Sequence, residues 1–317
     1  MRGTLQNLGG LACSLVAAIG VSFLGTNLGC SRAVGVKGEP VGVKSDPATT
    51  VELLFTYGSE KDSWLAEANK TFNGGNAKTK SGKTIHVKGI AVGSGELVDE
   101  ALKGRRKAHL ISPASGAYLE LGNAEARAAG GKDLVDTGKI KNLVFSPVVI
   151  AMWKPMAEAL GWPDKQIGWA DIHKLASDPK GWEAVGKGQW GPFKFAHTHP
   201  EYSNSGLISV LAEVYAGAGK TKIDADDVKN PKVAEYLKAI EKSVVHYGSS
   251  TGFFGKRMFA NPMTYLNAAV LYENMVIESY NLPNKAKTAA PIVAIYPNEG
   301  TFWADHPVAV VQREWVT

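Results

Sequence analysis

Residues 193–220, FKFAHTHPEYSNSGLISVLAEVYAGAGK, join a strand-like run to a helix through a short polar turn. FKFAH (193–197) predicts a strand, and the helix is predicted by apolar residues at the i, i+3, i+4, i+7, i+8 spacing, namely Leu207, Val210, Leu211, Val214 and Tyr215. Gly217 and Gly219 predict the helix end. The turn between strand and helix, Ser203-Asn204-Ser205-Gly206, either caps the first helical N–H groups or presents them to a polar or anionic ligand.

The same strand, polar turn and helix pattern occurs four more times along the chain. Its strand-like runs are VELLFTY (51–57), TIHVKGIAV (84–92), AHLI (108–111) and AAVL (268–271). Five such junctions predict parallel sheets with crossover helices, in which ligands bind at the carboxyl ends of the strands. Two apolar β-branched runs, 142–155 and 291–311, connect the two groups of junctions. We therefore expect an α/β fold of two lobes with mainly parallel sheets, joined by two crossover strands that act as hinges.

Six stretches of the sequence together resemble one family: LISPAS (110–115), GNAEARAAGGKDLV (122–135), FSPVVIAMWKPMAEALGW (145–162), SNSGL (203–207), YLNAAVLYENMVIES (265–279) and IYPNEGTFWADHPVAVV (295–311). They resemble the type II extracytoplasmic, or periplasmic, solute-binding proteins of ATP-binding-cassette transporters. The likeness is greatest to the substrate-binding module that precedes a von Willebrand factor A domain in some bacteria. This resemblance implies a clamshell with lobe one at 50–146 plus 306–317 and lobe two at 147–305.

The chain ends at REWVT (313–317), where the family usually continues with a helix that completes lobe one. We therefore expect that this C-terminal helix is missing and that the sequence is a fragment of a longer protein. A fused von Willebrand factor A domain is one continuation that the resemblance implies.

The resemblance implies that the ligand contacts lie at the strand-end turns of both lobes. They are Ser59, Ser94, Ser112 and Ser115 in lobe one, and Ser203, Asn204, Ser205, Gly206, Tyr272 and Glu273 in lobe two. Neutral hydroxyl and amide donors beside helix N–H groups suit a small polar or anionic solute. The implied partner is the membrane permease of an ABC transporter. For each of these residues, capping or core packing is the alternative role.

The first 30 residues have the pattern of an export signal. One charge, Arg2, precedes the apolar run from Leu8 to Gly25, and both cysteines of the chain, Cys13 and Cys30, lie in this segment. Cys30 follows Leu28-Gly29 as in a lipobox, so residues 1–30 are interpreted as a lipoprotein-type signal peptide with Cys30 as the lipidation site. An uncleaved membrane anchor is the alternative. Residues 31–49, rich in Gly, Pro, Val and Lys, predict a flexible tether that holds the body at the cell surface or in the periplasm.

The charge and composition of the chain limit the classes of partner that it is expected to bind. The net charge is +5 and charged residues make up 21% of the chain, without a long block of one sign. We expect no nucleic-acid partner, because nucleic-acid arms and patches concentrate their basic residues.

A serine hydrolase is the least favoured function. GSSTG (248–252) fits G-x-S-x-G around Ser250, but the preceding VAEYLKAIEKSVVHY is interpreted as a helix rather than the strand that such a nucleophile requires. The only later Asp and His are the adjacent Asp305 and His306. We predict no enzyme activity. An adhesion or scaffolding module of a larger surface protein ranks between the receptor and the hydrolase.

His197 and His199, with Glu201 nearby, suggest a metal site, because histidines two apart on a strand face the same way. No second histidine pair accompanies them, so we predict hydrogen bonding by these residues and neither a metal site nor a cofactor. Five tryptophans of lobe two are expected to pack its core, with stacking on an organic solute as the alternative. They are Trp153, Trp162, Trp169, Trp182 and Trp190.

Overall fold

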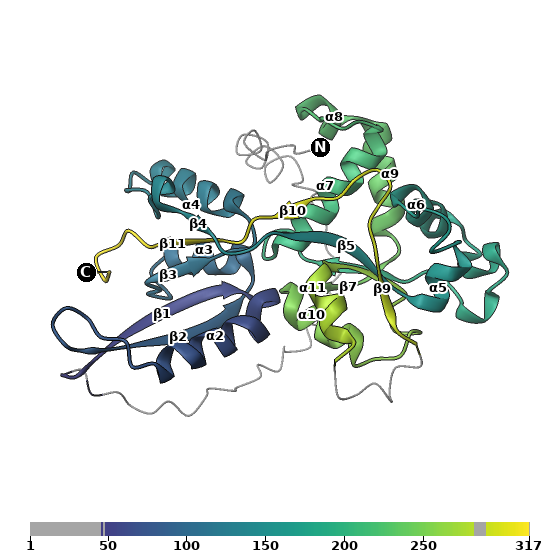
Figure 1. Ribbon diagram of the computed structural model, residues 1–317. Coiled ribbons are helices and arrows are strands. Elements are labelled where there is room, and N and C mark those ends of the chain that lie inside the picture. The colour runs from purple at the N-terminus through teal and green to yellow at the C-terminus, as the bar shows by residue number, and fades with distance from the viewer. Residues whose placement is uncertain (1–45, 47, 282–289, 317) are drawn as a thin grey trace, which may run out of the picture.

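The computed structural model describes residues 46, 48–281 and 290–316, so the predicted signal peptide and nearly all of the tether lie outside the described residues. Within these ranges no helix is long and apolar enough to cross a membrane. The described chain forms two α/β lobes, each built on its own open sheet, and two extended segments run between them (Figure 1). The predicted α/β two-lobed fold is confirmed.

The sheet of lobe one has five strands in the order β2-β1-β3-β11-β4. β1 pairs in parallel with both β2 and β3, whereas β11 runs antiparallel to β3 and β4. The strand bounds are β1 Thr50–Gly58, β2 Thr84–Val92, β3 Leu110–Ser112, β4 Lys141–Asn142 and β11 Pro307–Val310.

Helices cover both faces of this sheet. On one face α2 (Asp62–Gly74) brings Leu65 against Phe55 and Tyr57 of β1. On the other face lie α3 (Ser94–Leu102) and α4 (Gly116–Ala128), whose apolar residues form a larger core with β3 and β11 (Figure 1). Lobe one therefore has a core of its own, separate from that of lobe two.

The sheet of lobe two follows the order β10-β5-β8-β6-β7, with β9 paired to β5 off this path. β6 is parallel to β7 and β8, while β5 is antiparallel to β8, β9 and β10. β6, β7 and β8 are thus mutually parallel, as predicted, and the antiparallel pairs all involve β5 of the crossover segments. The strand bounds are β5 Ser146–Trp153, β6 Phe195–Thr198, β7 Val244–Gly248, β8 Ala268–Tyr272, β9 Ile292–Ile295 and β10 Trp303–Ala304.

Seven α-helices among the described residues pack around this second sheet. On one face His197 of β6 contacts Glu241 of α9, and on the opposite face His246 of β7 stacks on Phe254 of α10. The bounds are α5 Lys154–Ala159, α6 Trp169–Ser177, α7 Asn204–Ala218, α8 Ala225–Lys229, α9 Pro231–Glu241, α10 Thr251–Phe259 and α11 Glu273–Ser279.

The tryptophans of lobe two are packing residues. Trp153, Trp169 and Trp182 are at most 3% exposed. The indole N–H of Trp153 donates to Leu266 O at 2.6 Å, and that of Trp182 donates to Asn267 Oδ1 at 3.0 Å. Trp162 and Trp190 pack, partly buried, against the same core. Because all five rings pack in or against the core of lobe two, the alternative that they stack on an organic solute is not supported.

The chain passes from one lobe to the other twice. It leaves the first sheet between β4 and β5, and it returns between β10 and β11. The two passages lie side by side, since Val148 N donates to Phe302 O at 2.9 Å. We propose the lobe boundaries at these crossings.

One local prediction is wrong. The segment 233–247, interpreted as a single helix, contains the end of α9 at Glu241 and then β7, so GSSTG follows a strand and opens α10. In β7 Val245 and Tyr247 are 54% and 48% exposed while the alternate positions face inward, an alternation of period two. Five residues are too few for this period to stand out beside a preceding helical pattern.

The helix of the opening stretch is confirmed with one change. α7 ends at Ala218 with Gly219 in the left-handed region at φ 62°, as a glycine C-cap requires, whereas Gly217 lies inside the helix. Of the predicted apolar positions, Val210, Leu211 and Val214 are buried and Leu207 and Tyr215 partly buried; α7 also buries Ile208 and the charged Glu213. A buried glutamate on a helix calls for a partner from another element.

Candidate functional site

The two lobes are in contact at the carboxyl ends of their parallel strands. Gly95 N of α3 donates to Tyr202 O across the cleft at 3.0 Å, and the Tyr118 hydroxyl donates to Pro200 O at 3.4 Å. Asn274 Nδ2 of α11 donates to Glu60 O at 3.0 Å. These contacts join lobe-one turns to lobe-two turns, so the cleft is closed.

Glycine is required where the backbones of the two lobes meet. A Cβ on Gly95 would lie 2.1 Å from Glu201 O, and one on Gly93 would lie 2.3 Å from Tyr202 O. A Cβ on Gly252, in the first turn of α10, would lie 2.1 Å from Ser59 O. Any side chain at these positions would hold the lobes apart.

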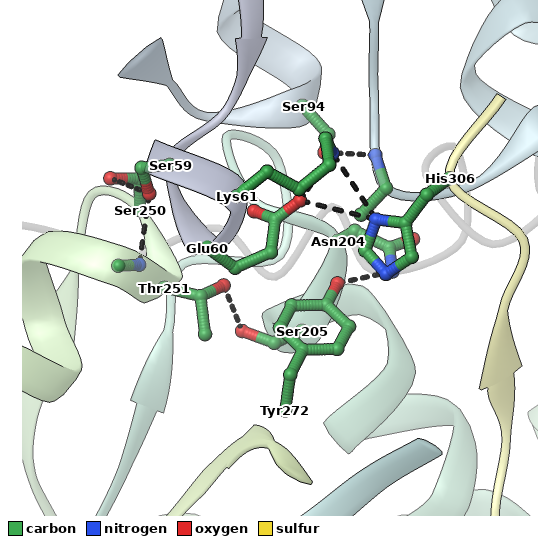
Figure 2. Close-up of polar contacts among 12 residues, drawn as sticks. Ser59, Glu60, Lys61, Ser94, Asn204, Ser205, Ser250, Thr251, Tyr272 and His306 are labelled. Atoms are coloured by element: carbon green, nitrogen blue, oxygen red, sulfur yellow. Dashed lines mark hydrogen bonds and ion pairs between the residues drawn. The ribbon is translucent and has the colours of Figure 1, made fainter. Parts of the chain in front are cut away.

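A charged cluster is buried between the lobes; we call Glu60, Lys61 and His306 the cleft cluster. Lys61 Nζ lies 2.6 Å from Glu60 Oε1 and 3.1 Å from His306 Nδ1, and all three residues are at most 6% exposed (Figure 2). Glu60 and Lys61 belong to the 3-10 helix η2 (Ser59–Lys61) after β1, and His306 lies between β10 and β11. His306 has a φ of +38°, a strained value for a residue with a side chain.

The electrostatics of the cleft cluster favour a charged pair. Burial alone would raise the pKa of Glu60, but the charge of Lys61 and the contacts of His306 outweigh it and lower that pKa to about 2. Burial lowers the pKa of Lys61, opposed by the attraction of Glu60. Burial is also the main cause that lowers the pKa of His306. A neutral imidazole then accepts from the ammonium, and the ionised carboxylate balances its charge.

Several sequence-predicted residues lie beside this cluster. Ser59 Oγ donates to Ser250 Oγ at 2.8 Å and accepts from Gly252 N at 2.9 Å, which links the lobes. Asn204 Nδ2 donates to the hydroxyl of Tyr272 at 2.7 Å, and the Tyr272 ring packs edge-on against His306 (Figure 2). The structure thus pairs Asn204 with Tyr272 beside His306, and Ser59 with the start of α10.

The remaining turn residues of lobe two have local partners. Ser203 Oγ is 3.1 Å and Ser205 Oγ is 2.7 Å from Thr251 Oγ1 at the start of α10. Ser203 is the N-cap residue of α7 by position, yet its side chain makes no capping hydrogen bond. Gly206 is needed because a Cβ there would lie 2.0 Å from Thr198 O.

The three other serines of lobe one differ in what they bind. Ser94 Oγ accepts from Ala114 N at 3.0 Å, and Ser115 caps α4 by accepting from Ala117 N at 3.3 Å. Ser112 is fully buried at the end of β3, and its hydroxyl has no partner among the described residues. Ser115 therefore acts as a helix cap in this structure, the role given above as the alternative to ligand binding.

Glu273 lies outside this group. It begins α11 half-buried, and its carboxylate accepts a hydrogen bond from the hydroxyl of Tyr296, a residue that is 48% exposed. The sequence placed it with Tyr272 because the two are adjacent, but they point to different partners.

Sequence reasoning missed all three residues of the cleft cluster. The available signal was the charged pair Glu60-Lys61 directly after the Gly58-Ser59 turn, since strand-end turns were already expected to form the site. His306 gave no such signal, because it lies 245 residues from Lys61 in the chain.

His197, His199 and Glu201, the metal site that the sequence analysis disfavoured, bind different partners. His199 lies beyond the end of β6, packs on Tyr202 and accepts from Glu201 N at 3.3 Å. His197 points elsewhere, with Nε2 3.0 Å from Glu241 Oε1. Both imidazoles contact the ring of Tyr247, but their hydrogen-bond partners differ, and hydrogen bonding is the role that the sequence predicted for these residues.

The fold and cleft define a two-lobed binding protein, and comparison with known proteins identifies its family. Residues 53–314 match the family described as bacterial extracellular solute-binding protein, and the chain belongs to this family. No curated protein matches the sequence.

Solved structures with this fold include the sulfate-binding protein SubI from Mycobacterium tuberculosis H37Rv, at 16% identity and a TM-score of 0.55, covering 84% of this chain and 78% of that one. A periplasmic thiamin-binding protein is similar at 10% identity and a TM-score of 0.55, covering 83% and 73%. The periplasmic binding protein AfuA from Actinobacillus pleuropneumoniae, with exogenous fructose-6-phosphate bound, is similar at 15% identity and a TM-score of 0.53, covering 82% and 74%. The matched family and these three structures are binding proteins rather than enzymes, and at such identities the likeness shows the fold.

Proposed function

We propose that this protein captures a small polar or anionic solute between its two lobes and delivers it to the permease of an ABC-type transporter. The observation that carries this proposal is the cleft cluster: an ion pair whose side chains are each 4% exposed, held between the lobes at the strand ends. Burying such a pair costs several kcal/mol of desolvation and seldom stabilises a fold by itself. A role in binding would explain why this costly ion pair lies at the lobe junction.

Lys61 is the residue that we propose contacts the solute directly. Opening the cleft returns its ammonium to water, and an anionic solute can then replace Glu60 as its partner. The first turns of α3, α7 and α10 meet at the same junction, and helix N-termini favour negative charge. Asn204 and Tyr272 add an amide and a hydroxyl from lobe two.

The solute enters through an open form. In the closed arrangement Lys61, Asn204 and Tyr272 are at most 4% exposed. The neighbouring cavity of about 50 Å³ has room for water rather than for an organic molecule, and its lining includes none of these three residues. Binding therefore couples to hinge motion at the two crossovers, and the solute shifts the population towards the closed form.

The proposal includes attachment of the mature chain to the membrane through Cys30 and a tether over residues 31–49. Membership of an extracellular family supports export, and lipidation is tested by mass spectrometry of the exported protein. A modified Cys30 at the new N-terminus is expected, and retention of residues 1–29 would indicate the uncleaved anchor. A fused von Willebrand factor A domain is tested by whether the reading frame continues beyond Thr317.

A thermal-shift and calorimetric screen tests the binding function. The panel is sulfate, phosphate, molybdate, fructose 6-phosphate, thiamin and a neutral sugar, chosen partly from what the structural neighbours bind. We expect saturable binding of one anionic or polar class, lost in Lys61→Gln and kept in the control Lys238→Gln, whose side chain is 61% exposed. Binding of none of these solutes by folded protein would favour the scaffolding role. Turnover of an ester lost in Ser250→Ala would favour a hydrolase.

A further inference from the structure

A second buried polar cluster lies wholly within lobe two. Its members, the lobe-two cluster, are His197 of β6, Glu213 of α7 and Glu241 at the end of α9, and one ligand atom of each lies within 4.8 Å of the others. Glu213 is nine residues after Asn204, about 13 Å further along α7. The lobe-two cluster is therefore distinct from the cleft cluster and plays no part in the proposed solute site.

The imidazole of His197 is oriented by its backbone contact. Nδ1 lies 2.8 Å from Thr198 O, and because a carbonyl can only accept, Nδ1 carries the proton. Nε2 then points at Glu241 Oε1 from 3.0 Å, with either a lone pair or a second proton. A lone pair that faces a carboxylate oxygen is repelled unless a metal ion bridges the two atoms or a proton lies between them.

Glu213 supplies a second, independent observation. It is 0% exposed, and although Oε1 accepts from Ser209 at 3.1 Å, Oε2 has no partner among the described residues. The other carboxylate, Glu241, accepts at its Oε2 from the Tyr247 hydroxyl at 2.6 Å. An unpartnered carboxyl oxygen in the interior, beside a second carboxylate, is costly unless a positive charge is shared between the two.

We propose that His197 Nε2 and one carboxylate oxygen from each of Glu213 and Glu241 bind a divalent cation of the Zn²⁺ type. Imidazole and carboxylate ligands suit this class of metal, and two carboxylates balance its charge. Bonds of about 2.1 Å in tetrahedral geometry place ligand atoms about 3.4 Å apart. His197 Nε2 and Glu241 Oε1 are 3.0 Å apart, and all three ligand atoms lie within 4.8 Å of one another, so small shifts would bring them to a metal ion. Thr198, Ser209 and Tyr247 hold the ligand groups in place, as outer-shell partners do in metal sites.

The cation would tie together the three elements that support the lobe-two side of the cleft. β6 and α7 flank the turn that carries Ser203 to Gly206, and α9 packs along α7. Its role is structural: the metal would fix α7 at Glu213, beyond the turn that faces the cleft, rather than touch the solute.

Protons, rather than a metal ion, are the alternative source of positive charge in the lobe-two cluster. In that state His197 is an imidazolium beside the Glu241 carboxylate, and Glu213 is protonated. Burial and the neighbouring Glu241 charge raise the pKa of Glu213 well above its ordinary value, so Glu213→Gln mimics the protonated form and is expected to fold. This variant removes one metal ligand and leaves the proton-filled arrangement intact. It therefore separates the two states.

Equilibrium dialysis of the chelator-stripped exported protein against Zn²⁺, and the visible spectrum with Co²⁺, provide the test. We expect the wild type to bind one equivalent of Zn²⁺ and to melt at a higher temperature with the metal than without it. With Co²⁺ it should show the absorption bands of a four- or five-coordinate ion. Binding should fall at least tenfold in Glu213→Gln and in His197→Gln.

The controls are His199→Ala and Glu201→Gln, which lie nearby in the chain but outside the cluster, and His306→Gln in the cleft. All three should bind Zn²⁺ as the wild type does. No saturable binding by the wild type, or binding unchanged by Glu213→Gln, would overturn the proposal and assign the cluster to protons. Because the wild-type measurement alone can give a negative answer, the test does not depend on the folding of any variant.

Discussion

The cleft cluster and the lobe-two cluster are both buried groups of polar, ionisable side chains that include one histidine. They differ in the motion that exposes them to water. Glu60, Lys61 and His306 come from segments on the lobe boundary, so parting the lobes returns them to water. His197 and Glu213 lie within a single lobe and are 0% exposed, so only local unfolding reaches them.

This difference separates a binding role from a structural one. A buried charge that motion can hydrate is able to exchange partners, as a ligand site must. A buried charge fixed inside one lobe must be satisfied permanently by a proton or a cation. The two clusters should consequently respond to different perturbations.

The largest effect is expected for His197→Ala, measured by urea unfolding in chelator. The change removes a fully buried imidazole and the partner that faces Glu241 Oε1, at a cost of about 3 to 4 kcal/mol of unfolding free energy. The side chain of Glu241 is 27% exposed, which holds the cost at the lower end for a broken buried pair. The control His86→Ala, on exposed β2, should cost less than about 0.5 kcal/mol. Equal effects of the two changes would mean that the lobe-two cluster carries no special stability.

Acid should destabilise the cleft cluster. The unfolded chain protonates Glu60 near the ordinary value of 4.5, whereas the folded pKa is about 2, so this contribution is complete above pH 4.5 and is lost as the pH falls towards 2. The lowered pKa of His306 adds a loss that begins below pH 6.5. For Glu60 the loss is at most about 3 kcal/mol. The urea midpoint should depend less on pH in Glu60→Gln than in the wild type across this range. The same pH dependence in both proteins would contradict the buried ion pair.

Gly252→Ala should prevent closure without unfolding either lobe. A Cβ there meets Ser59 O at 2.1 Å, whereas at Gly74 nothing lies within 4 Å, so Gly74→Ala is the matched control. Affinity for whichever panel solute binds should fall roughly a hundredfold, about 2.7 kcal/mol, with the melting temperature of the solute-free protein nearly unchanged. Wild-type affinity in Gly252→Ala would show that the lobes need not meet at α10.

The smallest effect is expected at Ser115, whose hydroxyl caps α4. Ser115→Ala should lower the unfolding free energy by about 1 kcal/mol and leave solute affinity unchanged, since the capping bond to Ala117 N is lost but the cleft cluster is not touched. A large loss of affinity in calorimetry would mean that Ser115 reaches the solute after all.

Most of the fold was predictable from sequence because its signals are local. The run 84–92 predicted β2 with its observed bounds, and the spacing after Ser203 predicted α7 and its glycine cap. β7 was missed because a five-residue strand directly after α9 shows too little of its own period.

The candidate site was less predictable because its members meet only through the fold. Ser59, Asn204 and Tyr272 lie at strand ends, where the topology places ligands, and the structure joins Asn204 to Tyr272 and Ser59 to the start of α10. His306 reaches Lys61 only because the second crossover returns beside β1's turn. Likewise, nothing in the chain order relates Glu213 to His197, since helix phase and the packing of α9 decide that contact.

Energy transfer between two labels measures most directly whether a solute closes the cleft. Because both native cysteines precede residue 31, engineered cysteines at Glu120 of α4 and Lys232 of α9 can be labelled cleanly in the mature chain, one on each lobe. Addition of the solute selected by the screen should change transfer efficiency saturably in the wild type and not in Lys61→Gln. Saturable binding of that solute with no change in transfer, or an equal change in Lys61→Gln, would contradict closure around the cleft cluster.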